Sequence, residues 1–236
     1  MTVGYGVCVG WWEEFTRYIV PQVGDRRVYG DGPPPERPVI ALGGQTSIAV
    51  AYNTILDAFH RQYGDQLDAV FLIHTDLSIS DPDGEAKILA AMGPDVALVG
   101  VEGGDGTRGT EWWECNPIGH QLLDRFYIDF AAQIPGAETG PADRTRPRAR
   151  SGDVDILEGS LLAFTPWAIR NLRFDETYPG FHGYDEICFQ AGAAGMRCVV
   201  VDVDTHHHTD GAYKGQASVD DWAAANRRSR ERWGKP

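Results

Sequence analysis

Acidic residues and histidines recur at three points of the sequence where a regular element begins or ends. Asp76 follows the short apolar run 68–73, which is typical of a β-strand. In open α/β sheets, ligands bind at the carboxyl ends of strands. Asp185 and Glu186 stand at the start of a helical segment, and three histidines, residues 206–208, follow the last apolar strand. In this order they suit a divalent cation, a general base and a further metal ligand.

Each of these segments also has a plain structural interpretation. A lone Asp after a strand is often a turn residue, and acids at a helix start are favoured by the positive end of the helix. Successive strand residues point to opposite faces, so three adjacent histidines cannot easily meet one ion. His206 and His208 would share one face, however, and this pair leaves a metal-dependent hydrolase open as an alternative function.

The elements that would position these residues alternate between strand and helix. This alternation predicts an α/β fold with a mostly parallel sheet flanked by helices. The clearest helix is 47–63, because Ser47 can cap it and apolar residues recur at three- and four-residue spacing. We expect strands at residues 5–10, 39–42, 69–73, 96–101, 154–164 and 198–203, and helices at residues 13–19, 47–63, 83–92, 166–172, 185–195 and 219–232.

The stretch 102–152 shows no regular apolar period, and we expect it to be irregular. Within it, 138–150 is rich in Pro, Arg and Gly and is predicted to be a mobile loop. Trp112 and Trp113 could stack on a sugar or nucleobase, or could fill the core.

Composition excludes several classes of protein. The formal net charge of −13, from 34 acidic and 21 basic residues, argues against nucleic-acid binding, which relies on Lys and Arg. The four scattered cysteines contain no CxxC pair, so a disulfide framework or zinc knuckle is not expected. No apolar run approaches the length of a transmembrane segment, and the N-terminus lacks the pattern of a signal peptide. We therefore expect a cytoplasmic protein.

Taken in order, three blocks of the sequence resemble the GT-A-fold glycosyltransferases of the family-2-like group. The first block resembles the family's helix and its DXD-type strand end, in a variant where His74 stands before the retained Asp76. The second resembles the acceptor-side strand and the "F-D-E" loop, and the third resembles the acidic catalytic helix and the histidine segment after the last strand. The blocks are 47–53 with 70–77, 154–164 with 173–176, and 181–190 through 194–195 to 207–208.

The resemblance implies a single GT-A catalytic domain over residues 1–236. Residues 1–101 would form the nucleotide-sugar-binding half, 102–152 an irregular loop region, and 153–236 the acceptor and catalytic half. The implied activity is transfer of a sugar, with inversion, from a UDP- or GDP-sugar to the hydroxyl of an unknown acceptor. A catalytically inert module that binds sugar nucleotides is a further alternative.

The resemblance also implies roles for particular residues. Mn²⁺ or Mg²⁺ would be held by Asp76, His207 and His208. The general base is Asp185 when the acidic block is matched from its left end and Glu186 when it is matched from its right, and we favour Asp185. The expected donor-binding residues are Gln45, Asn53, His74, Thr75 and Asp76. The oligomeric state is left open.

Overall fold

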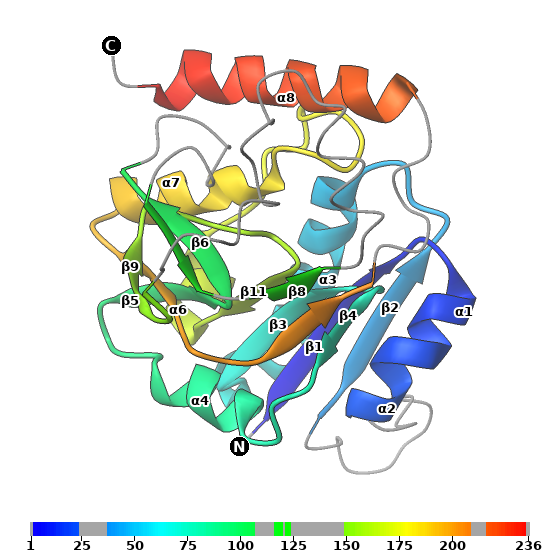
Figure 1. The fold of residues 1–236 in the computed structure, drawn as a ribbon. Coiled ribbons are helices and arrows are strands. Elements are labelled where there is room, and N and C mark those ends of the chain that lie inside the picture. The colour runs from blue at the N-terminus through cyan, green and yellow to red at the C-terminus, as the bar shows by residue number, and fades with distance from the viewer. Residues whose placement is uncertain are drawn as a thin grey trace.

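The structure, a computed structural model of the 236-residue chain, describes residues 2–23, 37–106, 116–119, 121–123, 149–208 and 216–234 (Figure 1). Its centre is a seven-stranded sheet with the order β2-β1-β3-β11-β5-β12-β9. Five of these strands run in one direction, while β11 and β9 run in the other. The strands are β1 (Val3–Val9), β2 (Val39–Gly43), β3 (Ala69–His74), β5 (Val96–Gly100), β9 (Gly152–Val154), β11 (Leu161–Phe164) and β12 (Arg197–Val200).

Two small three-stranded sheets adjoin the central one. The first pairs β10 (Ile156–Leu157), β6 (Glu102–Asp105) and β7 (Asn116–Gly119). The second pairs β4 (Leu77–Ile79), β13 (Thr205–His207) and β8 (Gln121–Leu123). The second sheet is important for the site, because it draws the histidine segment alongside the residues that follow β3.

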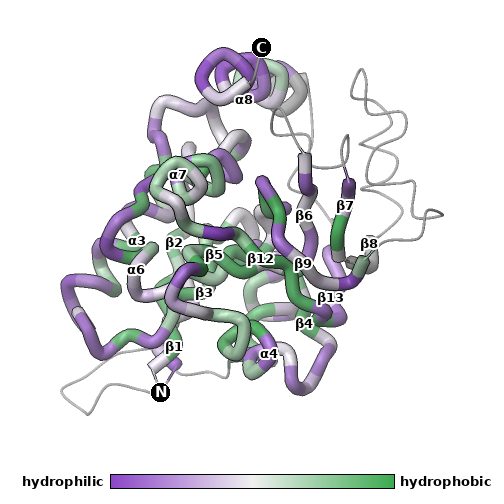
Figure 2. Tube along the Cα trace, turned by 90° about the vertical axis from the view of Figure 1, so that its left-hand side faces the viewer, coloured by the Kyte–Doolittle hydropathy of each residue, from purple (hydrophilic) through white to green (hydrophobic). Residues whose placement is uncertain are grey.

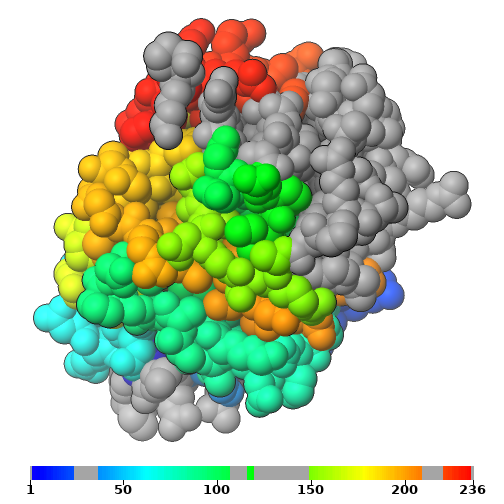
Figure 3. Space-filling model, turned by 60° about the vertical axis from the view of Figure 1, so that its left-hand side comes forward, coloured from blue at the N-terminus to red at the C-terminus, as the bar shows by residue number. Residues whose placement is uncertain are grey.

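Helices cover both faces of the central sheet (Figures 1 and 2). One face carries α3 (Ile48–Tyr63), α6 (Pro166–Asn171) and α7 (Ile187–Ala193). The other face carries α4 (Gly84–Ala90) and a continuous N-terminal helical segment of α1 (Trp12–Glu14), η1 (Phe15–Ile19) and α2 (Val20–Val23). A short 3₁₀ turn, η2 (Gly64–Gln66), follows α3. The last helix, α8 (Gln216–Trp233), lies over the segment that contains α7 (Figure 3).

The alternation of side chains along β3 divides the hydrophobic core in two. Val70 and Leu72 pack with α3, α6 and α7, whereas Phe71 and Ile73 pack on the opposite face with η1 and α4. This alternation is expected for a strand, where successive side chains point to opposite faces. Because both faces are covered, β3 is apolar from Ala69 to Ile73, as the run 69–73 had indicated. Figure 2 shows hydrophobic residues concentrated in the central strands.

The predicted helix over 47–63 is confirmed in its bounds and in its cap. Ser47 Oγ accepts a hydrogen bond from the Val50 N–H at 3.4 Å, an interaction generally worth about 1 kcal/mol. The buried face includes Tyr52, Ile55 and Phe59, none of which is exposed. This helix therefore packs its apolar face against the central sheet.

The prediction that the stretch 102–152 is irregular is wrong for several of its described segments. Residues 102–105, 116–119 and 121–123 are strands, although their sequences lack the apolar alternation of a half-buried strand. Their glycines are required by close backbone contacts: a Cβ on Gly103 would lie 2.4 Å from the Ile156 carbonyl oxygen. The remaining residues of this stretch, including Trp112, Trp113 and most of the predicted loop 138–150, lie outside the described residues.

Two predicted strands are shorter than expected. The run 154–164 is divided into β9, β10 and β11, and between β10 and β11 the chain turns where Glu158 accepts hydrogen bonds from the backbone and hydroxyl of Ser160. The run 198–203 ends at Val200, and His206 and His207 belong to the separate strand β13. Cys8, Cys188 and Cys198 are buried free thiols, in agreement with the expectation that they behave as hydrophobic residues.

Candidate metal and catalytic site

The segment after β3 holds the first part of the candidate site. His74 is the last residue of β3, and its backbone N–H donates to the Ser160 carbonyl oxygen at 2.9 Å. Thr75 and Asp76 form the turn into β4 and are both buried. The Asp76 carboxylate therefore lies at the carboxyl end of a central strand, where the sequence placed it.

The strand β13 brings a histidine to this carboxylate from a distant part of the chain. In the antiparallel pairing with β4, His207 stands opposite Leu77, the residue after Asp76. As a result His207 Nε2 lies 3.2 Å from Asp76 Oδ1, and both side chains are almost fully buried. The backbone N–H of His208 donates to the Asp76 carbonyl oxygen at 2.6 Å, which closes the junction between the two segments.

His74, Asp76 and His207 form a group that could hold a metal ion. One ligand atom from each residue lies within 4.8 Å of those of the other two. Two imidazoles and a carboxylate are a donor set that accepts first-row divalent ions and leaves room for further ligands. The residues present therefore fit a divalent cation.

The protonation of these three groups reflects their burial and mutual contact. Burial opposes the charged form of His207, yet the nearby Asp76 carboxylate outweighs it and raises the pKa of His207 to about 9. Burial likewise opposes ionisation of Asp76, but His207 holds the pKa of that carboxyl below its usual range. Burial, together with the neighbouring His207, lowers the pKa of His74. His74 is thus neutral at neutral pH, while His207 would have to lose its proton before it could bind a metal ion.

Two more carboxylates lie close to this group. Glu158 and Glu102 are buried, and their charges contribute to the raised pKa of His207. The backbone N–H of Glu158 donates to the Glu102 carbonyl oxygen at 2.7 Å, so the two residues are held together. Neither of them was assigned to the site from the sequence, although Glu158 lies within the block 154–164.

The acidic block lies on the 3₁₀ turn η4 (Tyr184–Glu186), directly before α7. Gly183 precedes it with φ of +72°, a left-handed conformation that favours glycine. Tyr184 is buried, and its hydroxyl lies 2.9 Å from His74 Nε2. This hydrogen bond brings the acidic block next to the metal-binding group.

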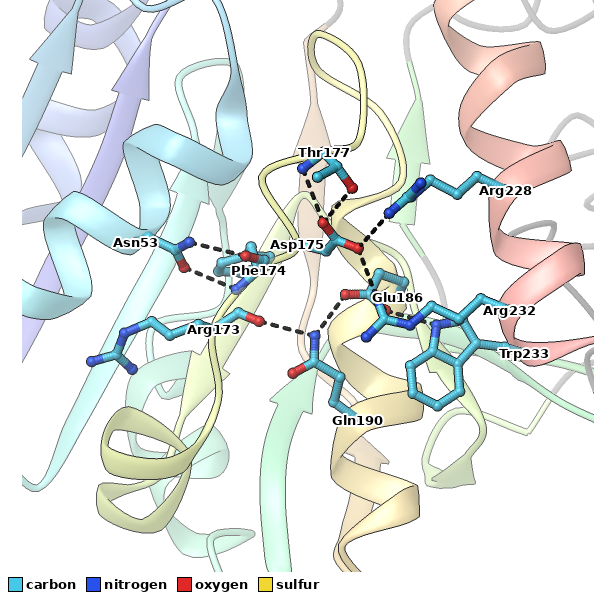
Figure 4. Close-up of polar contacts among 10 residues, drawn as sticks. All are labelled: Asn53, Arg173, Phe174, Asp175, Thr177, Glu186, Gln190, Arg228, Arg232 and Trp233. Atoms are coloured by element: carbon cyan, nitrogen blue, oxygen red, sulfur yellow. Dashed lines mark hydrogen bonds and ion pairs between the residues drawn. The ribbon is translucent and has the colours of Figure 1, made fainter.

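The two acids of the block have different surroundings. Glu186 is fully buried, and both its oxygens accept hydrogen bonds: Oε1 from Gln190 Nε2 at 2.6 Å and Oε2 from Trp233 Nε1 at 2.8 Å (Figure 4). Burial raises the pKa of Glu186 despite these donors. Asp185 is only half-buried. Of the two acids, Asp185 is therefore the more accessible to a substrate.

A polar network ties the "F-D-E" loop to three helices (Figure 4). The Asn53 amide of α3 pairs with the backbone of Phe174, donating to its carbonyl at 3.0 Å and accepting from its N–H at 2.9 Å. From α8, Arg228 and Arg232 contact Asp175 Oδ2 at 3.1 and 2.6 Å. Burial opposes ionisation of Asp175, but the hydrogen bonds from Thr177 and then the contact with Arg228 lower its pKa to about 2.

This network bears on Asn53, which the resemblance assigned to the donor. Both ends of its amide are engaged by Phe174, and Nδ2 also donates to Glu176 Oε1 at 2.8 Å. In this structure Asn53 anchors the loop 173–177. The remaining expected donor residues lie near the ends of β2 and β3: Gln45 Nε2 donates to the Gly43 carbonyl, and Thr75 Oγ1 to Glu14 Oε2.

The other two histidines of the triplet lie outside the metal-binding group. The His208 ring stacks on Tyr18, with ring centres 4.1 Å apart, and its Nε2 lies 3.0 Å from Ser78 Oγ. The His206 and His208 rings are 3.8 Å apart, so they do share one side of the chain as expected. Among the described residues, however, the group with metal-ligand geometry contains His207 and neither of its neighbours.

Comparisons with known proteins agree with this architecture. No protein-family model matches the chain. It is 28% identical over 225 residues to the streptomycin biosynthesis protein StrF of Streptomyces griseus, an alignment that covers 93% of this chain and 70% of that protein. Its structure resembles that of A197 from STIV, with a TM-score of 0.50 at 11% identity over 89% of this chain and 87% of that one.

A second solved structure similar to this chain is that of GalNAc-T7, determined with UDP, GalNAc and Mn²⁺. The TM-score is 0.55 at 11% identity, over 95% of this chain and 47% of that one. The chain thus spans about half the length of GalNAc-T7. At this identity the likeness shows the fold alone, a mixed α/β architecture with a seven-stranded, mostly parallel sheet flanked by helices, and this fold is the GT-A arrangement that the sequence predicted.

Proposed function

We propose that this protein is a glycosyltransferase that uses a nucleotide-sugar donor and a divalent cation. The observation that carries the proposal is the convergence of His74, Asp76 and His207 at the carboxyl end of β3, next to the acid-bearing turn η4. The GT-A fold adds support, as does GalNAc-T7, whose structure holds UDP and Mn²⁺. The similarity to StrF, a streptomycin biosynthesis protein, supports a role in a biosynthetic pathway.

The cation would be held by His74, Asp76 and His207. When bound, it would stabilise the negative charge that develops on the departing diphosphate. Because imidazole nitrogen is a poor ligand for Mg²⁺ and a good one for first-row transition ions, this donor set favours Mn²⁺ over Mg²⁺. His208, which the resemblance included, would support the site through its backbone contact with Asp76.

Asp185 would act as the general base that accepts the proton of the acceptor hydroxyl. Asp185 is half-buried on the turn η4, whereas Glu186 is fully buried and out of reach of a bound acceptor. A base must come within hydrogen-bond reach of the proton it removes. We therefore assign the base role to Asp185 and a supporting role to Glu186, with inversion at the anomeric carbon as the stereochemical outcome.

The donor assay that tests this proposal does not require the acceptor. Purified protein is incubated with UDP- and GDP-sugars, with Mn²⁺, Mg²⁺ or EDTA, and release of nucleoside diphosphate by slow transfer to water is followed. We expect release from at least one donor in Mn²⁺, less in Mg²⁺ and none in EDTA. If the protein neither binds nor turns over any of the sugar nucleotides with either metal ion, the proposal is refuted.

A further inference from the structure

Tyr184 connects the two halves of the candidate site. It is the first residue of η4 and directly precedes Asp185, while its hydroxyl lies 2.9 Å from Nε2 of His74. The two hydrogen-bonded residues are 110 positions apart in the sequence. Tyr184 is therefore part of the acidic turn, and its hydroxyl contacts the group that could hold the metal ion.

The protein is shaped around this ring. A Cβ on Gly159 would lie 2.0 Å from a ring carbon of Tyr184, so only glycine allows the ring to take this position. On another side, the ring meets Tyr52 of α3 edge to face, with centroids 6.1 Å apart. Since the ring is confined on these sides, the direction of the Tyr184 hydroxyl is fixed by packing.

The segment of Gly159 and Ser160 also fixes the backbone of His74. Ser160, the residue after Gly159, accepts the hydrogen bond of the His74 backbone N–H at 2.9 Å. The backbone of His74 is thus held by Ser160 and its ring by Tyr184. The hydroxyl contact restrains the rotation of the imidazole, and whether the hydroxyl donates or accepts depends on the tautomer of His74.

We propose that Tyr184 is a positioning residue, which orients His74 and selects its tautomer for binding of the cation. The inference rests on the proposed function, because it assigns His74 to the cation site. Partners that hold the second nitrogen of a metal-binding histidine typically contribute about 10–100-fold to metal affinity. Through Tyr184, the acidic turn and the cation site share one rigid connection.

Metal binding without any nucleotide tests this role directly. The Mn²⁺ affinities of the parent, Tyr184→Phe, His74→Ala and the double variant are measured by titration calorimetry. We expect Tyr184→Phe to weaken Mn²⁺ binding about 10–100-fold in the parent and to have no further effect in the His74→Ala background. Tyr63→Phe, which removes another buried tyrosine hydroxyl, is the matched control and should bind as the parent does.

A second measurement reads the tautomer of His74 directly and needs no metal ion. Nitrogen-15 chemical shifts of the His74 ring should show one dominant tautomer in the metal-free parent and in Tyr63→Phe, and a mixture in Tyr184→Phe. Unchanged affinity and an unchanged tautomer in Tyr184→Phe would overturn the proposal. An equal loss of affinity on the His74→Ala background would do the same, because it would show that Tyr184 acts through general packing.

The outcomes separate this inference from the proposed function. A parent that binds Mn²⁺ but no sugar nucleotide would refute the transferase and still allow the Tyr184 test to be decided. A parent that binds no Mn²⁺ would overturn the cation site, and with it the role assigned to Tyr184.

Discussion

The contact between His207 and Asp76 determines how the site responds to pH. A buried carboxylate stabilises the protonated imidazole, so the folded protein binds a proton more tightly than the unfolded chain does. The stabilisation is complete below the ordinary histidine pKa of about 6.5 and is lost as the pH rises through about 9. A metal ion has to displace that proton, so Mn²⁺ affinity should rise over the same pH interval.

We expect the free energy of unfolding of the metal-free protein to fall by about 3 kcal/mol between pH 6.5 and pH 9 because of this pair. His207→Gln should remove that part of the pH dependence. Urea denaturation of both proteins at several pH values measures the difference between the two profiles. Parallel profiles would show that His207 does not carry the raised pKa.

The two acids of η4 should respond differently to neutralisation. Asp185→Asn is expected to leave donor affinity near the parental value and to lower transfer about 10²–10⁴-fold, because a general base contributes only in the transition state. Glu186→Gln should transfer at close to the parental rate. It should instead lose about 1–3 kcal/mol of stability, since an amide cannot accept hydrogen bonds at both ends from Gln190 and Trp233.

The transfer rate and the free energy of unfolding are measured for both variants with the same donor. An inactive Glu186→Gln beside a nearly normal Asp185→Asn would reverse the assignment. Normal transfer by both variants would show that the general base does not lie on this turn.

At the scale of elements, the sequence predicted those parts whose periodicity follows from burial. The apolar run of β3 and the capped, periodic α3 were both recognisable, because burial of a whole strand or of one helix face leaves a clear pattern. The strands β6 and β7 were not recognisable, because their glycines are set by close contacts with other backbone atoms and give no alternation of apolar and polar residues. Their residues resemble a loop in composition, although they pair as strands.

The candidate site likewise contains residues that the sequence could point to and contacts that it could not. The resemblance named Asp76, His207 and His208 as metal ligands, and of these Asp76 and His207 lie in the group that could hold an ion. The contact of Tyr184 with His74 and that of Trp233 with Glu186 join residues 110 and 47 positions apart. Such contacts depend on how helices and turns pack in three dimensions, and no local pattern encodes them.

The contact of α8 with the acidic turn gives a prediction for that helix. Trp233→Phe keeps an aromatic ring against Phe189 but removes the N–H that bonds the buried Glu186. A buried acceptor that loses its donor costs about 1–3 kcal/mol. We expect a loss of that size in urea denaturation, and a change within about 0.5 kcal/mol for the exposed control Trp11→Phe. Equal values for the two variants would show that α8 does not hold the turn.

At the scale of the whole molecule, an acidic protein has to bind an anionic ligand through local features. The net charge of −13 repels a nucleoside diphosphate at long range. A cation at the carboxyl end of β3 would reverse the local charge and provide direct contacts for the phosphates. Binding of nucleotide should therefore depend on the metal.

No helix among the described residues has the length and apolar character needed to cross a membrane.

The most direct test of this account is the effect of Asp76→Asn on metal-dependent nucleotide binding. The melting temperature is followed with UDP or GDP, with Mn²⁺, and with both together, for the parent, for Asp76→Asn and for the exposed control Asp65→Asn. A ligand present at 100 times its Kd stabilises the native state by about 2.7 kcal/mol. The account predicts that nucleotide and Mn²⁺ together raise the melting temperature of the parent and of Asp65→Asn, and leave that of folded Asp76→Asn unchanged. An equal rise in Asp76→Asn would contradict it.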